Sequence, residues 1–152
     1  MTVRIDFKSA APDVFNAMRG LETCVRRAGL DRALLELVRT RVSQINGCAY
    51  CLDMHTKDAR AAGETEQRLN VLAAWREAPF YSGAERAALA WAEAVTKLAS
   101  NDVPDALYAE ARQHFDEKAL VDLTLAIVAI NGWNRLAVAF RSDVGSYRPT
   151  PG

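Results

Sequence analysis

The chain has 152 residues, a length that fits one domain with its own hydrophobic core. Half of its residues are apolar, and its 19 lysines and arginines balance its 19 aspartates and glutamates. This composition excludes a disordered chain and argues against a general polyanion binder. We therefore expect one globular domain over residues 1–152 and no nucleic-acid partner.

Neither the start of the chain nor its longest apolar stretch is typical of a membrane protein. Residues 1–8 alternate apolar and charged side chains, unlike a signal peptide or a membrane anchor. Residues 119–130 form the longest apolar stretch, but they include Asp122 and are fewer than the roughly 20 residues that a membrane-spanning helix needs. We expect a cytoplasmic protein without a membrane partner.

Glycine and proline, the residues that most often interrupt helices, are scarce in this chain. Pro12 suits the first turn of a helix, and Asp31 and Asp116 are suitable N-caps. Ser82 and Glu85 form a capping-box pattern. With the hydrophobic periodicity, these signals predict an all-α fold of about six to seven helices, near residues 12–28, 31–46, 48–62, 64–75, 82–98, 104–114 and 116–140.

Several positions are expected to weaken or end the helical pattern. Gly20 lies in the middle of the first predicted helix and could divide it in two, and Gly132 could disturb the last one. The helix that begins near residue 82 is expected to fail by Asn101. The tail from about residue 145 contains two prolines and is expected to be flexible.

Cys48 and Cys51 form a C-x-x-C pair at the start of a predicted helix, and His55 follows four residues later. At about 100° per residue these three side chains fall within an arc of about 60°, so one helix face presents two sulfurs and an imidazole. Such a dithiol can close into a disulfide, and the N–H groups of a helix start favour the thiolate. His55 is placed to take the proton of Cys51, which makes Cys51 the better attacking sulfur and Cys48 the better resolving one.

Other interpretations of this segment remain open. A structural zinc site needs four ligands, and the candidates beyond the pair are Cys24, His114 or a carboxylate. The two cysteines could also be buried apolar residues, with His55 satisfied in the core. A thioredoxin-like motif fits less well because it follows a strand, whereas the segment before Cys48 is predicted to be helical. Cys24 itself is expected to be a core or interface thiol.

Glu36 lies on the helix before the cysteine pair, on a stripe that it shares with Thr40 and Ser43. This stripe is opposite the apolar face of the helix, so periodicity favours exposure of Glu36 to solvent. If a neighbouring helix or subunit covers the stripe, Glu36 becomes a carboxylate near the thiols that can orient His55 or relay its proton. Tyr50, between the cysteines, could donate a hydrogen bond to a substrate oxygen or pack beneath the turn.

The spacing of Glu36, Cys48, Cys51 and His55 resembles the signature of the AhpD-like proteins in the carboxymuconolactone decarboxylase superfamily. The similarity runs from about residue 34 to residue 141 and includes the segment Ile-Asn-Gly-Trp-Asn-Arg at residues 130–135. The resemblance implies an all-helical fold, a homo-oligomer packed through apolar helices, and a peroxidase cycle on hydrogen peroxide or an organic hydroperoxide. The decarboxylases of the superfamily lack the redox pair, which argues against lactone decarboxylation.

Carried over residue by residue, the resemblance implies that Cys51 attacks the peroxide and becomes a sulfenic acid, with which Cys48 condenses. His55 and Glu36 would relay the proton, and an external dithiol would reopen the disulfide without a bound cofactor or metal. Well-known members carry a histidine where this chain has Tyr50. The alternatives are a disulfide reductase without peroxidase turnover and a non-catalytic oligomer that senses oxidation or binds a ligand.

Overall fold

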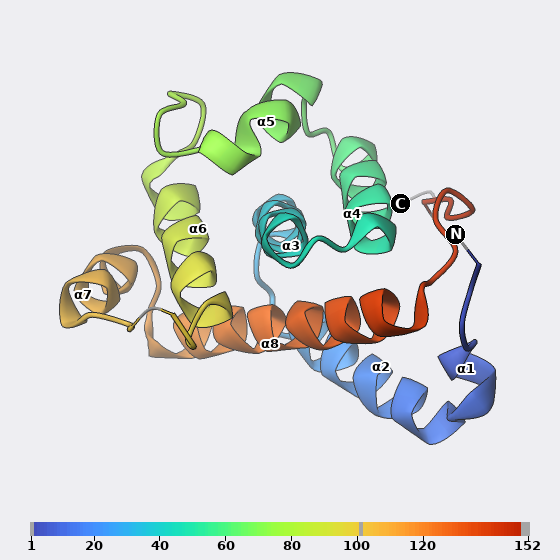
Figure 1. Cartoon of the computed structure of the whole chain (residues 1–152). Coiled ribbons are helices and arrows are strands. Elements are labelled where there is room, and N and C mark those ends of the chain that lie inside the picture. The colour runs from blue at the N-terminus through green and yellow to red at the C-terminus, as the bar shows by residue number, and fades with distance from the viewer. Residues whose placement is uncertain (1, 101, 150–152) are drawn as a thin grey trace.

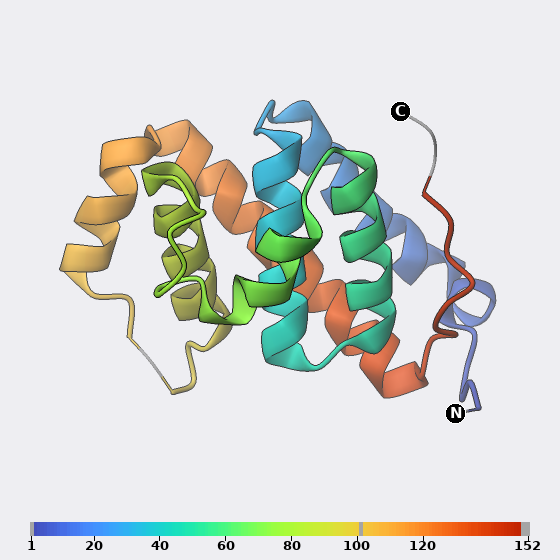
Figure 2. The same ribbon diagram turned by 90° about the horizontal axis from the view of Figure 1, so that it is seen from above.

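The computed structural model describes residues 2–100 and 102–149, and in these residues the fold is all-helical (Figures 1 and 2). This confirms the predicted fold class. The α-helices, with one short 3-10 helix η1, are α1 (Phe7–Ala10), α2 (Pro12–Arg27), α3 (Arg32–Asn46), α4 (Ala49–Ala61), α5 (Glu66–Val71), η1 (Leu72–Ala74), α6 (Gly83–Thr96), α7 (Asp105–His114) and α8 (Glu117–Phe140).

Helices α2 to α8 correspond to the seven predicted ones, and the three predicted N-caps, Asp31, Ser82 and Asp116, are in place. The Asp31 carboxylate accepts a hydrogen bond from Leu34 N at 2.7 Å, and that of Asp116 accepts one from Ala119 N at 2.7 Å. Both bonds of the capping box are present at the start of α6. These interactions lie within one helical turn, which is why the sequence suffices to predict them.

Two boundaries differ from the prediction, and one helix was missed. Helix α1 has only four residues, too few for a periodic pattern, and its cap is Asp6. The fourth predicted helix becomes α5 followed by η1, and α6 ends at Thr96. Asn101, where that helix was expected to fail, lies outside the described residues.

Helix α3 is the centre of the molecule. Figure 1 shows it nearly end-on, with α4, α6 and α8 around it. Nine of its residues are buried, and these come from its polar stripe as well as from its apolar one. Because neighbours enclose the helix, its hydrophobic periodicity does not indicate which side meets solvent.

Helix α8 crosses beneath α3 and packs against α2, α4, α6 and α7 as well (Figure 1). Neither Gly132 here nor Gly20 in α2 interrupts its helix. A Cβ added at Gly132 would lie 2.9 Å from Met18 Cε, so this glycine permits close packing of α8 on α2. In the described chain α8 is the one helix long and apolar enough to cross a membrane by length and composition, a test that buried core helices also pass.

A polar network fixes the end of α3 on α8. The Asn46 amide nitrogen donates to Asn131 Oδ1 at 3.0 Å and to Asn134 Oδ1 at 2.9 Å. The Asn134 amide donates in turn to Ser43 Oγ at 3.1 Å. Gly47 then ends α3 with a positive φ of 65°, a conformation that glycine adopts without strain. Together these contacts determine where α4 begins.

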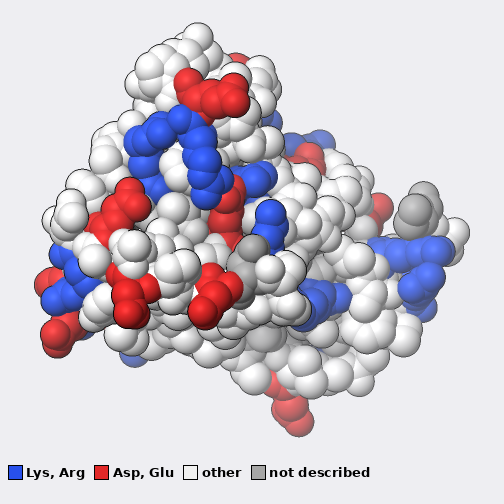
Figure 3. All heavy atoms as spheres, turned by 60° about the vertical axis from the view of Figure 1, so that its left-hand side comes forward, with Lys and Arg blue, Asp and Glu red and all other residues white. Residues whose placement is uncertain are grey.

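The segments before α1 and after α8 lie on the α4 side of the molecule in both ribbon views (Figures 1 and 2). Arg4 N donates to Phe140 O at 3.0 Å, and the Tyr147 hydroxyl donates to Asp58 Oδ1 at 2.8 Å. The tail that was expected to be flexible thus makes this contact in its described part, whereas residues 150–152 lie outside the described residues. On the opposite side, basic and acidic side chains are intermixed (Figure 3).

Candidate active site

The cysteine pair lies at the start of α4, immediately after the turn at Gly47. Cys48 is the N-cap of α4, and its Sγ accepts a hydrogen bond from Cys51 N at 3.3 Å. The two residues form a disulfide, with their Cα atoms 5.4 Å apart, and each is only 1% exposed. A sulfur at this position meets the positive end of the helix dipole, which favours a thiolate after reduction.

His55 lies one turn after Cys51 on α4 and is 6% exposed. Its Nδ1 is 2.8 Å from Glu36 Oε2 on α3. Burial raises the pKa of Glu36, but the hydrogen bonds and positive charges of His55 and Arg39 outweigh burial and hold it below its ordinary value. The ionised Glu36 accepts the Nδ1 proton of His55, so in the neutral form of the imidazole Nε2 is the nitrogen that can accept a proton.

Arg39 connects this pair to two further helices. Its Nη1 donates to Glu36 Oε1 at 2.9 Å, and its Nη2 donates to Glu22 Oε2 on α2 at 2.6 Å. Glu22 also accepts a hydrogen bond from the indole of Trp133 on α8 at 3.2 Å. The chain of contacts from α4 to α8 holds the Glu36 carboxylate in one orientation towards His55.

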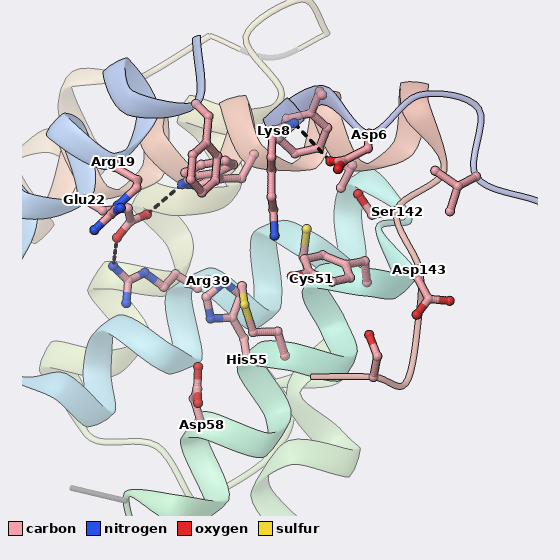
Figure 4. Close-up of a pocket in the computed structure, with 18 of the residues that line it drawn as sticks. Asp6, Lys8, Arg19, Glu22, Arg39, Cys51, His55, Asp58, Ser142 and Asp143 are labelled. Carbon is pink, nitrogen blue, oxygen red and sulfur yellow. Dashed lines mark hydrogen bonds and ion pairs between the residues drawn. The ribbon is translucent and has the colours of Figure 1, made fainter. Parts of the chain in front are cut away.

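A cavity of about 590 Å³ opens beside the cysteine pair, between α1, α2, α3, α4, α8 and the segment after α8 (Figure 4). Cys51 and His55 line this cavity, and Cys48 does not. A small molecule in the cavity can therefore reach the sulfur of Cys51, with the imidazole of His55 on the same wall.

Tyr50 also lines the cavity, and it packs against the hydrophobic core. Burial and the negative charge of Asp53 raise the pKa of Tyr50, so its hydroxyl keeps its proton near neutral pH. A protonated phenol can donate a hydrogen bond to an oxygen atom of a substrate. The two functions that the sequence left open for Tyr50 are thus compatible.

Asp58 lies at the end of the cavity that is far from α1 (Figure 4), and its Oδ1 accepts a hydrogen bond from the Tyr147 hydroxyl. Burial and this hydrogen bond raise the pKa of Tyr147 above its ordinary value. Ligand atoms of Glu36, His55 and Asp58 lie within 4.8 Å of one another, so these three residues could hold a metal ion. The hydrogen bond between Glu36 and His55 already gives two of them a structural explanation.

The structure brings together four of the residues that the sequence singled out, Glu36, Tyr50, Cys51 and His55, around the cavity, with Cys48 directly behind. The periodicity argument for Glu36 was wrong, because the side chain is 4% exposed beneath its neighbours. Cys24, which was expected to be a core or interface thiol, is exposed in this chain, so it is not a core residue.

The sequence analysis missed further residues of the site, among them Lys8, Arg19, Glu22, Asp58 and Tyr147. Asp58 lies three residues after His55 on α4, and this spacing could have indicated it. The others reach the site from distant segments. Trp133 Nε1 and Glu22 are separated by 111 residues, and no local pattern reports such a contact.

Comparison with known proteins identifies the class to which this fold and site belong. The family model of the carboxymuconolactone decarboxylase family matches residues 12–94. The uncharacterised protein YdfG of Bacillus subtilis is 45% identical over 146 residues, which are 96% of this chain and 99% of YdfG. The chain belongs to the carboxymuconolactone decarboxylase family.

Solved structures with the same fold place the chain among the AhpD-like members. A protein of unknown function from Agrobacterium tumefaciens, provisionally assigned as the antioxidant defence protein AhpD, has a TM-score of 0.92 and 44% identity, covering 96% of this chain and 100% of that one. The debrominase Bmp8 has a TM-score of 0.80 and 23% identity, covering 91% of this chain and 74% of Bmp8. The second similarity concerns the fold alone, so the chemistry must be argued from the residues.

Proposed function

We propose that this protein is a thiol-dependent peroxidase that reduces hydrogen peroxide or an organic hydroperoxide through the Cys48–Cys51 pair. One observation carries the proposal: Cys51, paired with Cys48 in a disulfide, shares a cavity wall with His55, whose Nδ1 is bonded to the buried and ionised Glu36. A dithiol, a base and an orienting carboxylate are the groups that thiol peroxidase chemistry needs.

In the first step the thiolate of Cys51 attacks the hydroxyl oxygen of the peroxide. An S–O bond forms, the O–O bond breaks, and the sulfur is oxidised to sulfenic acid by two electrons. His55 Nε2 takes the thiol proton and returns it to the leaving alkoxide, which departs as an alcohol or, from hydrogen peroxide, as water. Glu36 acts as a positioning residue that stabilises the imidazolium formed between the two transfers.

In the second step the thiolate of Cys48 attacks the sulfur of the sulfenic acid. The S–S bond forms, the S–O bond breaks, and the hydroxide leaves as water with a proton from the site. The backbone N–H of Cys51, which points at Cys48 Sγ, favours the thiolate that this attack requires. An external dithiol then reduces the disulfide by two exchange reactions and is itself oxidised.

The cycle is complete with two cysteines and an external dithiol, so our proposal includes no bound cofactor or metal. We further propose that the protein works in the cytoplasm and, from the resemblance described above, as a homo-oligomer. We propose that the partners are the hydroperoxide and a dithiol or redox-protein reductant rather than nucleic acid, because the 19 lysines and arginines of the chain are balanced by 19 aspartates and glutamates.

Mass spectrometry of trapped thiols tests the proposal, in a Cys24→Ser background that removes the exposed thiol. After one equivalent of peroxide we expect the Cys48–Cys51 disulfide in the parent protein. In Cys48→Ser a sulfenic acid should persist on Cys51, and in Cys51→Ser the remaining thiol should stay reduced. Dithiol-dependent turnover should be present in the parent protein alone.

Two results would overturn the proposal, each in favour of a different alternative. Rapid exchange with dithiols but no peroxide-dependent turnover would indicate a disulfide reductase. Thiols that stay reduced at peroxide concentrations that oxidise an ordinary exposed cysteine would indicate a non-catalytic oligomer, in which replacement of both cysteines leaves ligand binding intact.

A further inference from the structure

The volume of the cavity indicates the size of the ligand that it can hold. A volume of about 590 Å³ lies within the range of about 300–1,000 Å³ that is usual for organic ligands. Hydrogen peroxide is little larger than a water molecule, whose share of the liquid is about 30 Å³. A site built for hydrogen peroxide alone would not need this space, so the cavity fits a hydroperoxide with an organic body.

One wall of the cavity is aromatic. Phe15 on α2 and Trp133 on α8 pack edge-on with ring centroids 5.8 Å apart, and Phe7 lies 6.4 Å from Trp133. All three side chains line the cavity, together with Met54 of α4. Such a wall binds apolar and aromatic groups by burying their surface.

Two cations flank this wall. Lys8 Nζ lies 5.5 Å from the centroid of the Phe15 ring, and the Arg19 guanidinium lies 6.0 Å from the same ring. Within the described residues neither cation has a carboxylate oxygen within 4.0 Å, in contrast to Arg39, which binds two glutamates. Figure 4 shows the Lys8 side chain extending from α1 into the cavity in the direction of Cys51.

Three carboxylates that line the cavity either bind groups other than Lys8 Nζ and the Arg19 guanidinium or lie on the opposite side of the cavity from Arg19. Asp6 accepts hydrogen bonds from Lys8 N at 3.1 Å and from Ser9 Oγ at 2.6 Å, as the cap of α1. Glu22 binds Arg39 and Trp133. Asp143 is on the opposite side of the cavity from Arg19, with Cys51 between them (Figure 4). Hydrogen bonds do not remove the charge of Asp6 or Glu22, but the lining of the α1–α2 end also has three cations, Lys8, Arg19 and Arg26. This end is therefore weakly positive, whereas Asp58 and Asp143 make the other end negative.

We infer that the preferred substrate is an organic hydroperoxide that carries an anionic group, such as a carboxylate, on an apolar or aromatic body. Lys8 and Arg19 hold the anion, the aromatic wall holds the body, and the hydroperoxide reaches Cys51. The inference rests on the proposed peroxidase function and adds to it the class of substrate and two residues that determine specificity.

A matched pair of substrates tests this inference. Cumene hydroperoxide with a carboxylate at the para position and its methyl ester differ in charge but present the same reacting group. We expect kcat/KM for the acid to exceed that for the ester by about fivefold, the factor of a charge interaction at a partly exposed site, and the ratio to fall as salt is raised. In the double variant Lys8→Gln/Arg19→Gln the ratio should approach one.

The matched control is Arg27→Gln, which removes a cation from the same helix as Arg19 but outside the cavity lining. This variant should keep the ratio of the parent protein. A ratio near one in the parent protein, or one that the double variant leaves unchanged, would overturn the inference while the peroxidase function stands.

A binding measurement separates failure of the inference from failure of the function. The alcohols that correspond to the two substrates cannot be reduced, and calorimetry can compare their affinities for the oxidised protein. Tighter binding of the acid, lost in the double variant, without turnover of either hydroperoxide would support the binding site and reject the peroxidase. Equal affinities would reject the binding site.

Discussion

Two buried glutamates, Glu36 on α3 and Glu93 on α6, invite comparison because their surroundings are similar. Both are less than 10% exposed and both bind arginine. Glu93 accepts hydrogen bonds from Arg41 Nε at 2.7 Å, from Arg76 Nη1 at 2.6 Å and from the Trp75 indole at 3.0 Å. For each glutamate, burial raises the pKa, but its partners outweigh burial and the pKa is lowered.

The two clusters differ in the chemistry of the groups that bind the carboxylate. The partners of Glu93 are two arginines and an indole, which act only as hydrogen-bond donors. Glu36 binds His55, whose imidazole can accept a proton as well as donate one, and His55 shares a cavity with Cys51. A smaller hollow of about 300 Å³ adjoins Glu93 without a cysteine or histidine in its lining. A buried carboxylate with a lowered pKa thus indicates an active site only when it binds a side chain that can take part in the reaction.

The largest effect on activity is expected at His55. The variant His55→Gln keeps a hydrogen-bonding side chain near Glu36 but removes the base, so peroxide-dependent turnover should fall by about 10²-fold or more. Stopped-flow measurement of Cys51 oxidation checks this expectation. A decrease smaller than threefold would mean that His55 is a structural residue, like the partners of Glu93.

The variant Glu93→Gln should affect stability instead. It leaves Arg41, whose side chain is 13% exposed, and the exposed Arg76 with a neutral partner, which should cost about 2 to 3 kcal/mol of unfolding free energy, most of it from the loss of the buried charge pair with Arg41. Urea denaturation measures this loss. Turnover per folded molecule should equal that of the parent protein, and a tenfold decrease would show that the two clusters do not differ in the way we describe.

The same substitution at the other glutamate, Glu36→Gln, should lower turnover by about 10- to 100-fold, because a neutral amide stabilises the imidazolium of His55 less well than a carboxylate does. Comparison with Glu93→Gln is the control, since both changes remove one buried charge. If Glu36→Gln alters stability alone, the proton relay is wrong.

At acid pH, the dependence of the unfolding free energy on pH should include a contribution from both glutamates. Since the pKa of each is lower in the folded chain than its ordinary value of 4.5, each carboxylate adds stability above that value, which is lost as the pH falls through the folded pKa. Unfolding free energies measured between pH 6 and about pH 3 should therefore fall less steeply in either Gln variant than in the parent protein. An unchanged slope would contradict the lowered values.

The smallest effect is expected at Gly20, in the middle of α2. A Cβ added there meets nothing within 4 Å, so Gly20→Ala should raise the unfolding free energy by about 0.5–1 kcal/mol through helix propensity. Turnover should not change. The variant thus tests whether the unfolding free energy can rise while turnover stays constant. A parallel rise in turnover would show that stability and activity are coupled.

The local features of the molecule could be predicted because they arise within one or two helical turns. Asp31, Ser82 and Asp116 cap the helices that their sequence context indicated. Cys51 and His55 share one face of α4 because the helical repeat alone determines that geometry. Helix α1 escaped prediction because four residues do not show a period.

The burial of Glu36 is a feature that prediction from helical periodicity got wrong. Periodicity indicates the side of a helix that meets the core only when the other side meets solvent, and α3 has neighbours on several sides. The resemblance to AhpD-like proteins predicted the proximity of Glu36 to the thiols, whereas the pattern of the helix itself predicted the opposite.

The sequence by itself therefore determined helices α2 to α8, the three N-caps Asp31, Ser82 and Asp116, and the cysteine and histidine face, since backbone geometry relates residues a few positions apart. Only the tertiary structure decided which carboxylate meets His55, where the cavity lies and which cations face it. Those relations join segments as distant as Asp58 and Tyr147, 89 residues apart, and depend on how helices pack. Packing arises from the shapes of many side chains at once, which no local pattern in the chain records.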